Sequence, residues 1–180
     1  MTITQASRAA RLIIVMGVSG AGKSTIGEAL AHRLEVPFID ADDLHPRSNV
    51  EKMRSGVALV DADRWPWLEI VADAMRKAAD TNGSVVCACS ALRRIYRDRL
   101  RQRADEDVAF VLLDGDHAVI AARQANRPGH YMPASLLQSQ FATLERFEDD
   151  EHGIEIDVSL PVDAIIDEAV HMLDQRRSTT

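Results

Sequence analysis

Short apolar runs alternate with amphipathic stretches along the chain. Five of these runs have the length of a strand and are apolar almost throughout, at residues 11–16, 38–40, 84–89, 108–114 and 154–158. Such runs are typical of parallel strands that are buried on both faces. The intervals between them repeat apolar residues every three or four positions, which is the spacing of a helix with one buried face. The alternation predicts an α/β fold with three layers, α/β/α, around a five-stranded parallel sheet.

A helix is predicted in each interval between the strands. The first, over 24–34, places Ile26, Leu30 and Leu34 on one face. Further helices are expected over 93–103, 117–126 and 134–145. The closing helix, over 161–175, is expected to bury Val162, Ile165, Ile166, Ala169, Val170 and Leu173.

Two other helices carry local start signals. Ser48 and Glu51 have the spacing of a capping box, which predicts a short helix over 48–55. Pro66 is suited to the first position of a helix, so a long helix is predicted from there to about residue 80, after an acidic turn at 61–63.

Length, charge and cysteine content narrow the class of protein. A chain of 180 residues fits one domain, and we expect a flexible N-terminus over 1–10 and a single folded domain over 11–180. The apolar runs are too short to span a bilayer, and residues 1–10 do not form a signal peptide. A net charge of −7 argues against broad binding to nucleic acid or membranes. Cys87 and Cys89 are predicted to be reduced core thiols of a cytoplasmic protein.

A phosphate-binding loop follows the first strand. The motif GxxxxGK[ST] is matched at every fixed position by Gly17, Val18, Ser19, Gly20, Ala21, Gly22, Lys23 and Ser24. Glycines let the backbone wrap a phosphate closely, and the N-terminus of the following helix attracts anions. We therefore predict an ATP site formed by this loop and Thr25, with Lys23 as a catalytic charge at the β- and γ-phosphates and Ser24 as a Mg²⁺ ligand.

Two carboxylates stand where the second strand ends. Ligands of open parallel sheets bind at the carboxyl ends of the strands, so Asp40 and Asp42 are expected near the γ-phosphate. Phosphoryl transfer to an alcohol needs a metal held by oxygen ligands and a base at the acceptor hydroxyl. We predict Asp40 as a Mg²⁺ ligand and Asp42 as the catalytic base. A solvated acidic turn is the alternative.

A pair of arginines is predicted to cover the phosphates. Arg123 and Arg127 are four residues apart on one helix face, and a segment with proline and glycine follows at 127–133. A small helical lid over about 123–145 would bring these arginines to ATP, stabilise the transferring charge and exclude water, with Arg127 as the catalytic one. A surface helix with solvated arginines is the alternative.

Other charged side chains near this edge carry weaker signals. His45 and His130 are candidate hydrogen-bond donors to a polyol or carboxylate, or simply turn residues. Arg93, at the start of a basic helix, is a candidate anion clamp, and the arginines from Arg97 to Arg103 are expected to form a mostly solvated face.

The phosphate loop alone does not identify the reaction. A GTPase should carry [NT]KxD, and none of the three lysines, Lys23, Lys52 and Lys77, lies in that context. A motor or large ATPase needs a longer chain. The paired carboxylates and the lid arginines instead indicate a kinase that phosphorylates a small hydroxylated molecule.

Several segments outside the loop resemble the gluconokinase family, whose fold is that of shikimate and nucleoside-monophosphate kinases. The resemblance extends over nearly the whole chain. It is carried by DLHP at 43–46, NVEKM at 49–53, DADRWPWL at 61–68, CSALR at 89–93, YRD at 96–98, RPGHYM at 127–132 and LLQSQF at 136–141. These segments are specific to the family, whereas many unrelated proteins share the phosphate loop.

The resemblance implies phosphorylation of D-gluconate at its 6-hydroxyl by ATP, giving 6-phospho-D-gluconate, with Mg²⁺ as cofactor and a homodimer as the assembly. It implies an adenine site in the turn at 158–161. It also implies a substrate site formed by Asp42, His45, Arg54, Arg93, His130 and Gln140. Two alternatives stay open: a kinase for another small acid such as shikimate, and a regulatory nucleotide-binding module without turnover.

Overall fold

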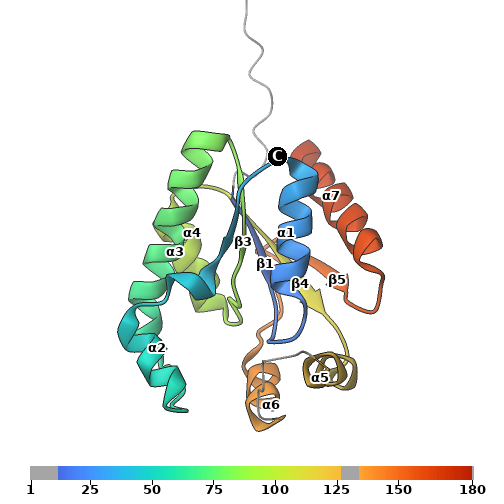
Figure 1. Ribbon diagram of the computed structural model, residues 1–180. Helices are drawn as coiled ribbons and strands as arrows, with labels where there is room; N and C mark the ends of the chain where they lie inside the picture. The colour runs from blue at the N-terminus through green and yellow to red at the C-terminus, as the bar shows by residue number, and fades with distance from the viewer. Residues whose placement is uncertain (1–11, 127–133, 180) are drawn as a thin grey trace, which may run out of the picture.

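A parallel β-sheet forms the centre of the molecule (Figure 1). The computed structural model describes residues 12–126 and 134–179. In these residues the sheet has five strands in the order β2-β3-β1-β4-β5, and all neighbouring pairs are parallel. The strands are β1 (Leu12–Met16), β2 (Phe38–Asp40), β3 (Val85–Ala88), β4 (Val108–Asp114) and β5 (Ile154–Asp157). The predicted α/β fold with a five-stranded parallel sheet is confirmed.

Helices cover both faces of the sheet and gather at one of its ends. Figure 1 shows α1 and α7 on one side, α3 and α4 on the other, and α2, α5 and α6 at the lower end. The helices are α1 (Lys23–Leu34), the 3₁₀ helix η1 (Ala41–Leu44), α2 (Arg47–Arg54), α3 (Asp61–Asn82), α4 (Arg94–Ala104), α5 (His117–Ala125), α6 (Ala134–Thr143) and α7 (Val162–Thr179).

The alternation of side chains along β1 builds two cores. Leu12, Ile14 and Met16 point toward α3 and α4, whereas Ile13 and Val15 point toward α1 and α7. All five are buried because β1 is the central strand. The backbone of this strand is therefore rigidly placed, and so is the start of the loop that follows it.

The carboxyl ends of the strands form one edge, which lies at the bottom of Figure 1. A helix that connects two parallel strands runs antiparallel to them, so α1, α3 and α4 each begin at this edge. The phosphate loop, η1 and the first turns of α3 and α4 therefore meet at one end of the sheet.

The predicted capping box of α2 is wrong. The helix begins at Arg47 with Pro46 as its N-cap residue, and no side chain caps this end. The Pro46 carbonyl accepts a hydrogen bond from the N–H of Asn49 at 2.9 Å. Glu51 pairs with Arg47 at 2.7 Å instead of returning to Ser48. The fixed φ of proline sets the entry angle without a serine cap.

Helix α3 begins at Asp61 and not at Pro66, so the predicted acidic turn is its first turn. The Asp63 carboxylate accepts a hydrogen bond from the N–H of Val60 at 2.9 Å and pairs with Lys52 at 2.6 Å. These contacts stabilise the first turn of α3, five residues before Pro66. Pro66 therefore lies inside the helix, where it has no N–H to donate.

Two further expectations at helix ends are wrong. Helix α6 ends at Thr143, before the predicted 145, because the N–H of Glu145 donates to the Leu92 carbonyl at 2.8 Å. Val162 is 44% exposed and not inward, since it is the first residue of α7. The other predicted inward positions of this helix are buried or pack against the core.

Arg97 of α4 is fully buried, contrary to the solvated face predicted for it. Its Nε and Nη2 each donate to the Glu151 carboxylate at 2.7 Å, and its Nη1 donates to the Glu145 carbonyl at 3.0 Å. Arg101 also reaches Glu151, at 3.2 Å. A buried guanidinium needs such partners. They come from residues 48 and 54 positions further along the chain, which the spacing of arginines within one helix cannot reveal.

The thiol prediction is confirmed: Cys87 and Cys89 are free and buried on the α3/α4 side of the sheet. Burial raises the pKa of Cys89 to about 12, so this thiol stays protonated. Within the described part of the chain, we find no helix with the length and apolarity that crossing a bilayer requires.

Replacing Glu151 by glutamine should lower the free energy of unfolding by about 3–5 kcal/mol at neutral pH, because Arg97 would stay buried without its counter-ion. Burial alone would raise the pKa of Glu151, but hydrogen bonds from Arg97, from the backbone N–H of Glu148 and from Arg101 outweigh it and lower this pKa from 4.5 to about 2. A carboxyl group whose pKa is lowered by folding stabilises the folded state fully at pH values above its unfolded-state pKa. The stabilisation should therefore be complete above pH 4.5 and decline as the pH falls toward 2.

Urea unfolding at pH 7 and over an acid series measures both effects. Glu148→Gln is the matched control, since Glu148 is exposed and its pair with Arg94 should contribute about 0–1 kcal/mol. Equal losses in the two variants, or a difference that does not narrow on acidification, would show that the Arg97–Glu151 pair is not the stabilising contact.

Candidate active site

The loop between β1 and α1 has the conformation that the phosphate-binding motif requires. Gly17, Gly20 and Gly22 have φ values of 145°, 81° and 96°, which favour glycine. A Cβ on Gly17 would also lie 3.0 Å from the carbonyl oxygen of Leu113. Gly22 is the N-cap residue of α1, so the free N–H groups of the first helical turn face the loop.

Ser24 and Asp40 lie together, as expected for a shared metal site. The Ser24 hydroxyl, in the first turn of α1, donates to Asp40 Oδ2 at 2.6 Å, and Asp40 is the last residue of β2. Asp40 Oδ1 accepts a hydrogen bond from the N–H of Asp42 at 3.0 Å, which caps η1. The predicted metal ligands are thus adjacent, and Asp42 is held beside them.

This oxygen pair fits Mg²⁺, which typically binds proteins through one or two carboxylates and takes its other ligands from water and substrate phosphates. In residues 12–126 and 134–179 there is no group of three His, Cys, Asp or Glu residues that could hold a metal. Ser24 and Asp40 are the candidate ligands because their oxygens lie 2.6 Å apart at the phosphate-binding end of the sheet.

Lys23 reaches back across the phosphate loop. Its Nζ donates to the carbonyl of Val18 at 3.0 Å, which holds the ammonium at the loop. Thr25 is exposed in the first turn of α1, one residue beyond Ser24. Both predicted nucleotide residues therefore lie at the phosphate-binding end of the sheet.

Ser19 connects the loop to α5 and α6. Its backbone N–H donates to Gln140 Oε1 at 2.6 Å, and its hydroxyl accepts a hydrogen bond from Gln124 Nε2 at 3.0 Å. Gln140 therefore contacts the nucleotide loop in this structure, and its predicted contact with the acceptor stays a prediction. Gln124 belongs to no recognised motif, and only the folded chain brings it to Ser19.

His45 is fixed beside η1 by Trp67. The Trp67 indole donates to the Ala41 carbonyl at 2.8 Å, and the His45 ring stacks on Trp67 with centroids 4.1 Å apart. The Asn49 amide nitrogen donates to the Asp63 carbonyl at 2.9 Å and lies 3.3 Å from His45 Nδ1. Since that nitrogen is a donor, Nδ1 is the acceptor and the ring proton is on Nε2.

The His45 ring is also kept neutral. Burial is the main cause that lowers its pKa, the charge of Arg64 acts in the same direction, and Asp42 opposes them. A neutral ring with its proton on Nε2 is a hydrogen-bond donor to a hydroxyl or carboxylate oxygen. The role predicted for His45 stays a prediction, and its Asn49 partner becomes visible only in the folded chain.

Arg93 is already engaged with carboxylates. Its Nη1 lies 3.0 Å from Asp61 and its Nε 3.3 Å from Glu145. Asp61 also accepts a hydrogen bond from the Tyr96 hydroxyl at 2.6 Å. The other arginine proposed for the acceptor, Arg54, is exposed at the last position of α2.

Arg123 lies at the turn predicted to hold adenine. Its Nη2 donates to the carbonyl of Val158 at 2.6 Å, just after β5. Arg127 and His130, the other lid residues assigned from the sequence, lie outside the described residues. Of the lid, the structure therefore places Arg123 and helix α6.

The chain is similar to known small-molecule kinases over almost its whole length. Residues 12–147 match the family model described as an AAA domain. A gluconokinase from Arabidopsis thaliana is 45% identical, with 91% of this chain and 92% of that protein covered. The crystal structure of a gluconokinase from Sinorhizobium meliloti 1021 is 44% identical, with a TM-score of 0.85 and 96% of each chain covered. A shikimate kinase from Aquifex aeolicus, at 17% identity and a TM-score of 0.54 over 91% of this chain and 96% of that one, shares the fold alone.

Proposed function

Because the chain belongs to the gluconokinase family, we propose that it transfers the γ-phosphoryl group of ATP to the 6-hydroxyl of D-gluconate, giving 6-phospho-D-gluconate. The chain is an ATP-dependent gluconate kinase. One observation supports the assignment of roles most directly. The 2.6 Å hydrogen bond between Ser24 and Asp40 joins the start of α1, next to the phosphate loop, to the end of β2, and η1 with Asp42 follows directly.

The phosphate loop supplies binding and charge. Its inward N–H groups and the N-terminus of α1 hold the phosphates, and Lys23 adds a positive charge at the β- and γ-phosphates. Ser24 and Asp40 would hold Mg²⁺, which neutralises phosphate charge when bound. Arg123 and Arg127 complete the nucleotide site in this proposal, with Arg127 as the catalytic arginine.

Asp42 is the proposed base for the acceptor hydroxyl. Among the described residues, its carboxylate makes no hydrogen bond or ion pair, while its backbone is fixed by Asp40. An unengaged carboxylate beside the metal ligands is suited to accept the proton as the hydroxyl attacks. His45, as a neutral donor, is proposed to bind a gluconate hydroxyl on the same side.

We also propose that residues 123–145 act as a lid. Gln124 and Gln140 contact Ser19 of the phosphate loop, so this region is joined to the loop that is proposed to bind the nucleotide. By family resemblance we propose a cytoplasmic homodimer. Its reduced, buried Cys87 and Cys89 are compatible with that compartment.

ADP release measured against a panel of acceptors tests the proposed function. The panel contains D-gluconate, its epimers, shikimate and nucleoside monophosphates. We expect turnover with D-gluconate, and we expect Lys23→Ala to abolish it, because the charge at the phosphates is lost. Turnover on shikimate or a nucleotide, and none on gluconate, would reject the assigned substrate. ATP binding without any acceptor-dependent ADP release would indicate a regulatory module instead.

Asp42→Asn should lower kcat about 100- to 10,000-fold, because the variant keeps the shape of the side chain but cannot accept the proton. The KM for ATP should stay near the wild-type value. Asp43→Asn is the matched control, since Asp43 is the next residue of η1 and is also exposed. If Asp42→Asn retains the wild-type kcat, or if both variants lose the same amount, the base is a different residue.

A further inference from the structure

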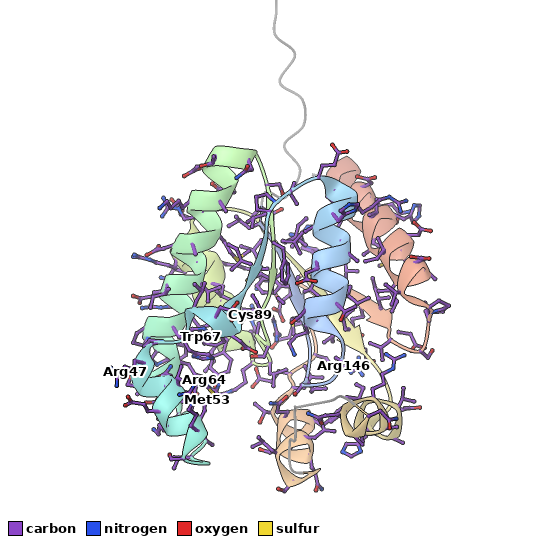
Figure 2. All side chains as sticks on the ribbon, in the orientation of Figure 1. Arg47, Met53, Arg64, Trp67, Cys89 and Arg146 are labelled. Atoms are coloured by element: carbon purple, nitrogen blue, oxygen red, sulfur yellow. The ribbon has the colours of Figure 1, made fainter. Side chains whose placement is uncertain are left out.

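Arg64 has an unusual environment for a charged side chain near an active site. It lies in the first turn of α3, three and four residues before the buried Trp67 and Leu68, and therefore on the helix side that faces the sheet. Its Nε is buried without a hydrogen-bond partner, and its Nη2 donates to the Leu59 carbonyl at 3.1 Å. Figure 2 labels Arg64 together with Trp67 and Met53 at the end of the molecule where α2 and the start of α3 lie.

The acidic residues closest in sequence are occupied by other partners. Asp61 accepts hydrogen bonds from Arg93 and Tyr96, and Asp63 accepts one from Lys52. Among the described residues Arg64 forms no ion pair, although its charge is near enough to Asp61 and Asp63 to help lower the pKa of both carboxylates. A partly buried guanidinium is costly to leave without a directly bonded counter-ion. The Nη1 of Arg64 makes no hydrogen bond among the described residues and, unlike Nε, is not buried, so an anionic ligand can bind the guanidinium there.

The position of Arg64 favours the acceptor side of the site. Its guanidinium lies 5.5 Å from the centroid of the Tyr96 ring, and its charge is near enough to His45 to affect that ring. His45 stacks on Trp67, whose indole is bonded to η1, the helix that carries Asp42. Arg64 on α3, Asp42 on η1 and His45 directly after η1 therefore lie at the same end of the sheet.

Arg64 is better suited to bind an anion than the other two arginines assigned from the sequence. Arg93 already faces Asp61 and Glu145, so a substrate carboxylate would have to displace one of them. Arg54 is exposed, and a hydrated guanidinium gains little from an anion in water.

We propose that Arg64 binds the carboxylate of the acceptor and so orients its far hydroxyl toward Asp42. The inference rests on the proposed function, which supplies an acceptor with a carboxylate at one end and the phosphorylated hydroxyl at the other. Guanidinium–carboxylate pairs are strong and directional, so a single contact of this kind selects hydroxy acids over neutral polyols.

Steady-state kinetics of Arg64→Met test this role. The KM for D-gluconate should rise about 10- to 100-fold, because charge-assisted hydrogen bonds to the carboxylate are lost. The KM for ATP should stay near the wild-type value. Inhibition by D-glucitol, which has a hydroxymethyl group in place of the carboxylate, should be the same in both proteins. Arg64→Lys, which keeps the charge but not the planar fork, should show a smaller rise in the KM for gluconate.

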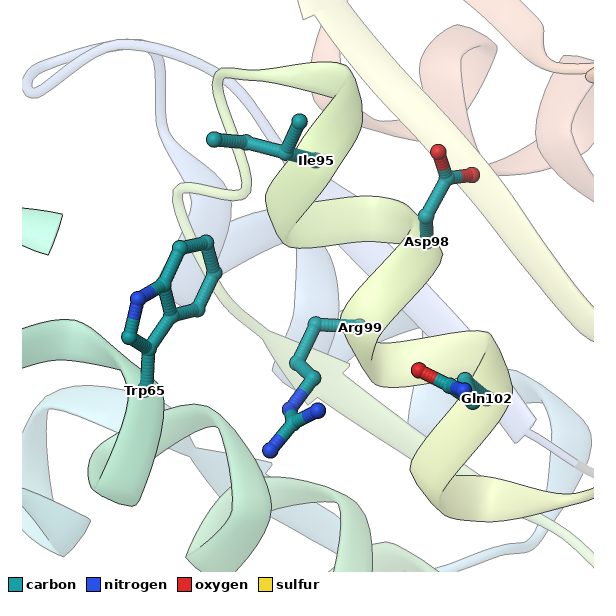
Figure 3. A pocket seen from close by; sticks show the side chains of 5 residues that line it. All are labelled: Trp65, Ile95, Asp98, Arg99 and Gln102. Carbon is teal, nitrogen blue, oxygen red and sulfur yellow. The ribbon is translucent and has the colours of Figure 1, made fainter.

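Arg99→Met is the matched control. Arg99 is the other described arginine with a buried, unpartnered Nε, but it pairs with Glu69. It lines a pocket of about 340 Å³ between α3 and α4, together with Trp65, Ile95, Asp98 and Gln102 (Figure 3). Its substitution should leave the KM for gluconate unchanged. The unfolding midpoints of all variants show whether each one is folded.

The outcomes separate the two levels of the proposal. A wild-type protein that does not phosphorylate gluconate would refute the proposed function. An active wild-type protein with an unchanged gluconate KM in Arg64→Met would refute only the role of Arg64. A raised KM for ATP with an unchanged KM for gluconate would assign Arg64 to the nucleotide phosphates and also overturn the proposal.

Discussion

The parallel arrangement of the five strands is the constraint on which the rest of the structure depends. It brings the carboxyl ends of all strands, and the N-termini of α1, α3 and α4, to one edge of the sheet. Because β1 is central and fully buried, the loop that follows it is anchored in the middle of that edge. Gly17 and Gly22 then turn the backbone into a phosphate cradle. Residues that are far apart in the sequence therefore become neighbours at this edge.

A small set of polar contacts converts this geometry into a site with defined chemistry. The Ser24–Asp40 hydrogen bond joins the phosphate loop to β2, and the Trp67–Ala41 hydrogen bond joins α3 to η1. The ion pair between Arg97 and Glu151 joins α4 to the segment that enters β5. Buried polar groups of this kind are costly when unpaired, so each contact favours one arrangement of the elements that it connects. The Asp42 carboxylate and the Arg64 guanidinium take no part in these contacts, so a substrate can bind to them.

The sequence predicted the features that depend on neighbouring residues. Strand-length apolar runs and the motif at Gly17–Ser24 are local signals, and both the sheet and the loop follow them. One error arose where a distant partner decides the structure, since Arg97 is buried by its pair with Glu151, 54 residues away. Two others arose where several local start signals compete: Ser48 and Pro66 have suitable spacing, but Pro46 and Asp63 start the two helices instead. Arg64 was missed as an anion-binding residue. Only the structure shows that Asp61 and Asp63 bond to Arg93 and Lys52 and form no ion pair with Arg64.

The central claim is that one edge of the sheet holds the acceptor between two fixed groups, with its hydroxyl at Asp42 and its carboxylate at Arg64. A crystal structure of the protein with D-gluconate and a non-hydrolysable ATP analogue tests it most directly. We expect the 6-hydroxyl within hydrogen-bond distance of Asp42, about 2.6–3.2 Å, and the carboxylate paired with Arg64. A gluconate bound in the reverse direction, or with its carboxylate on Arg54 or Arg93, would contradict this account.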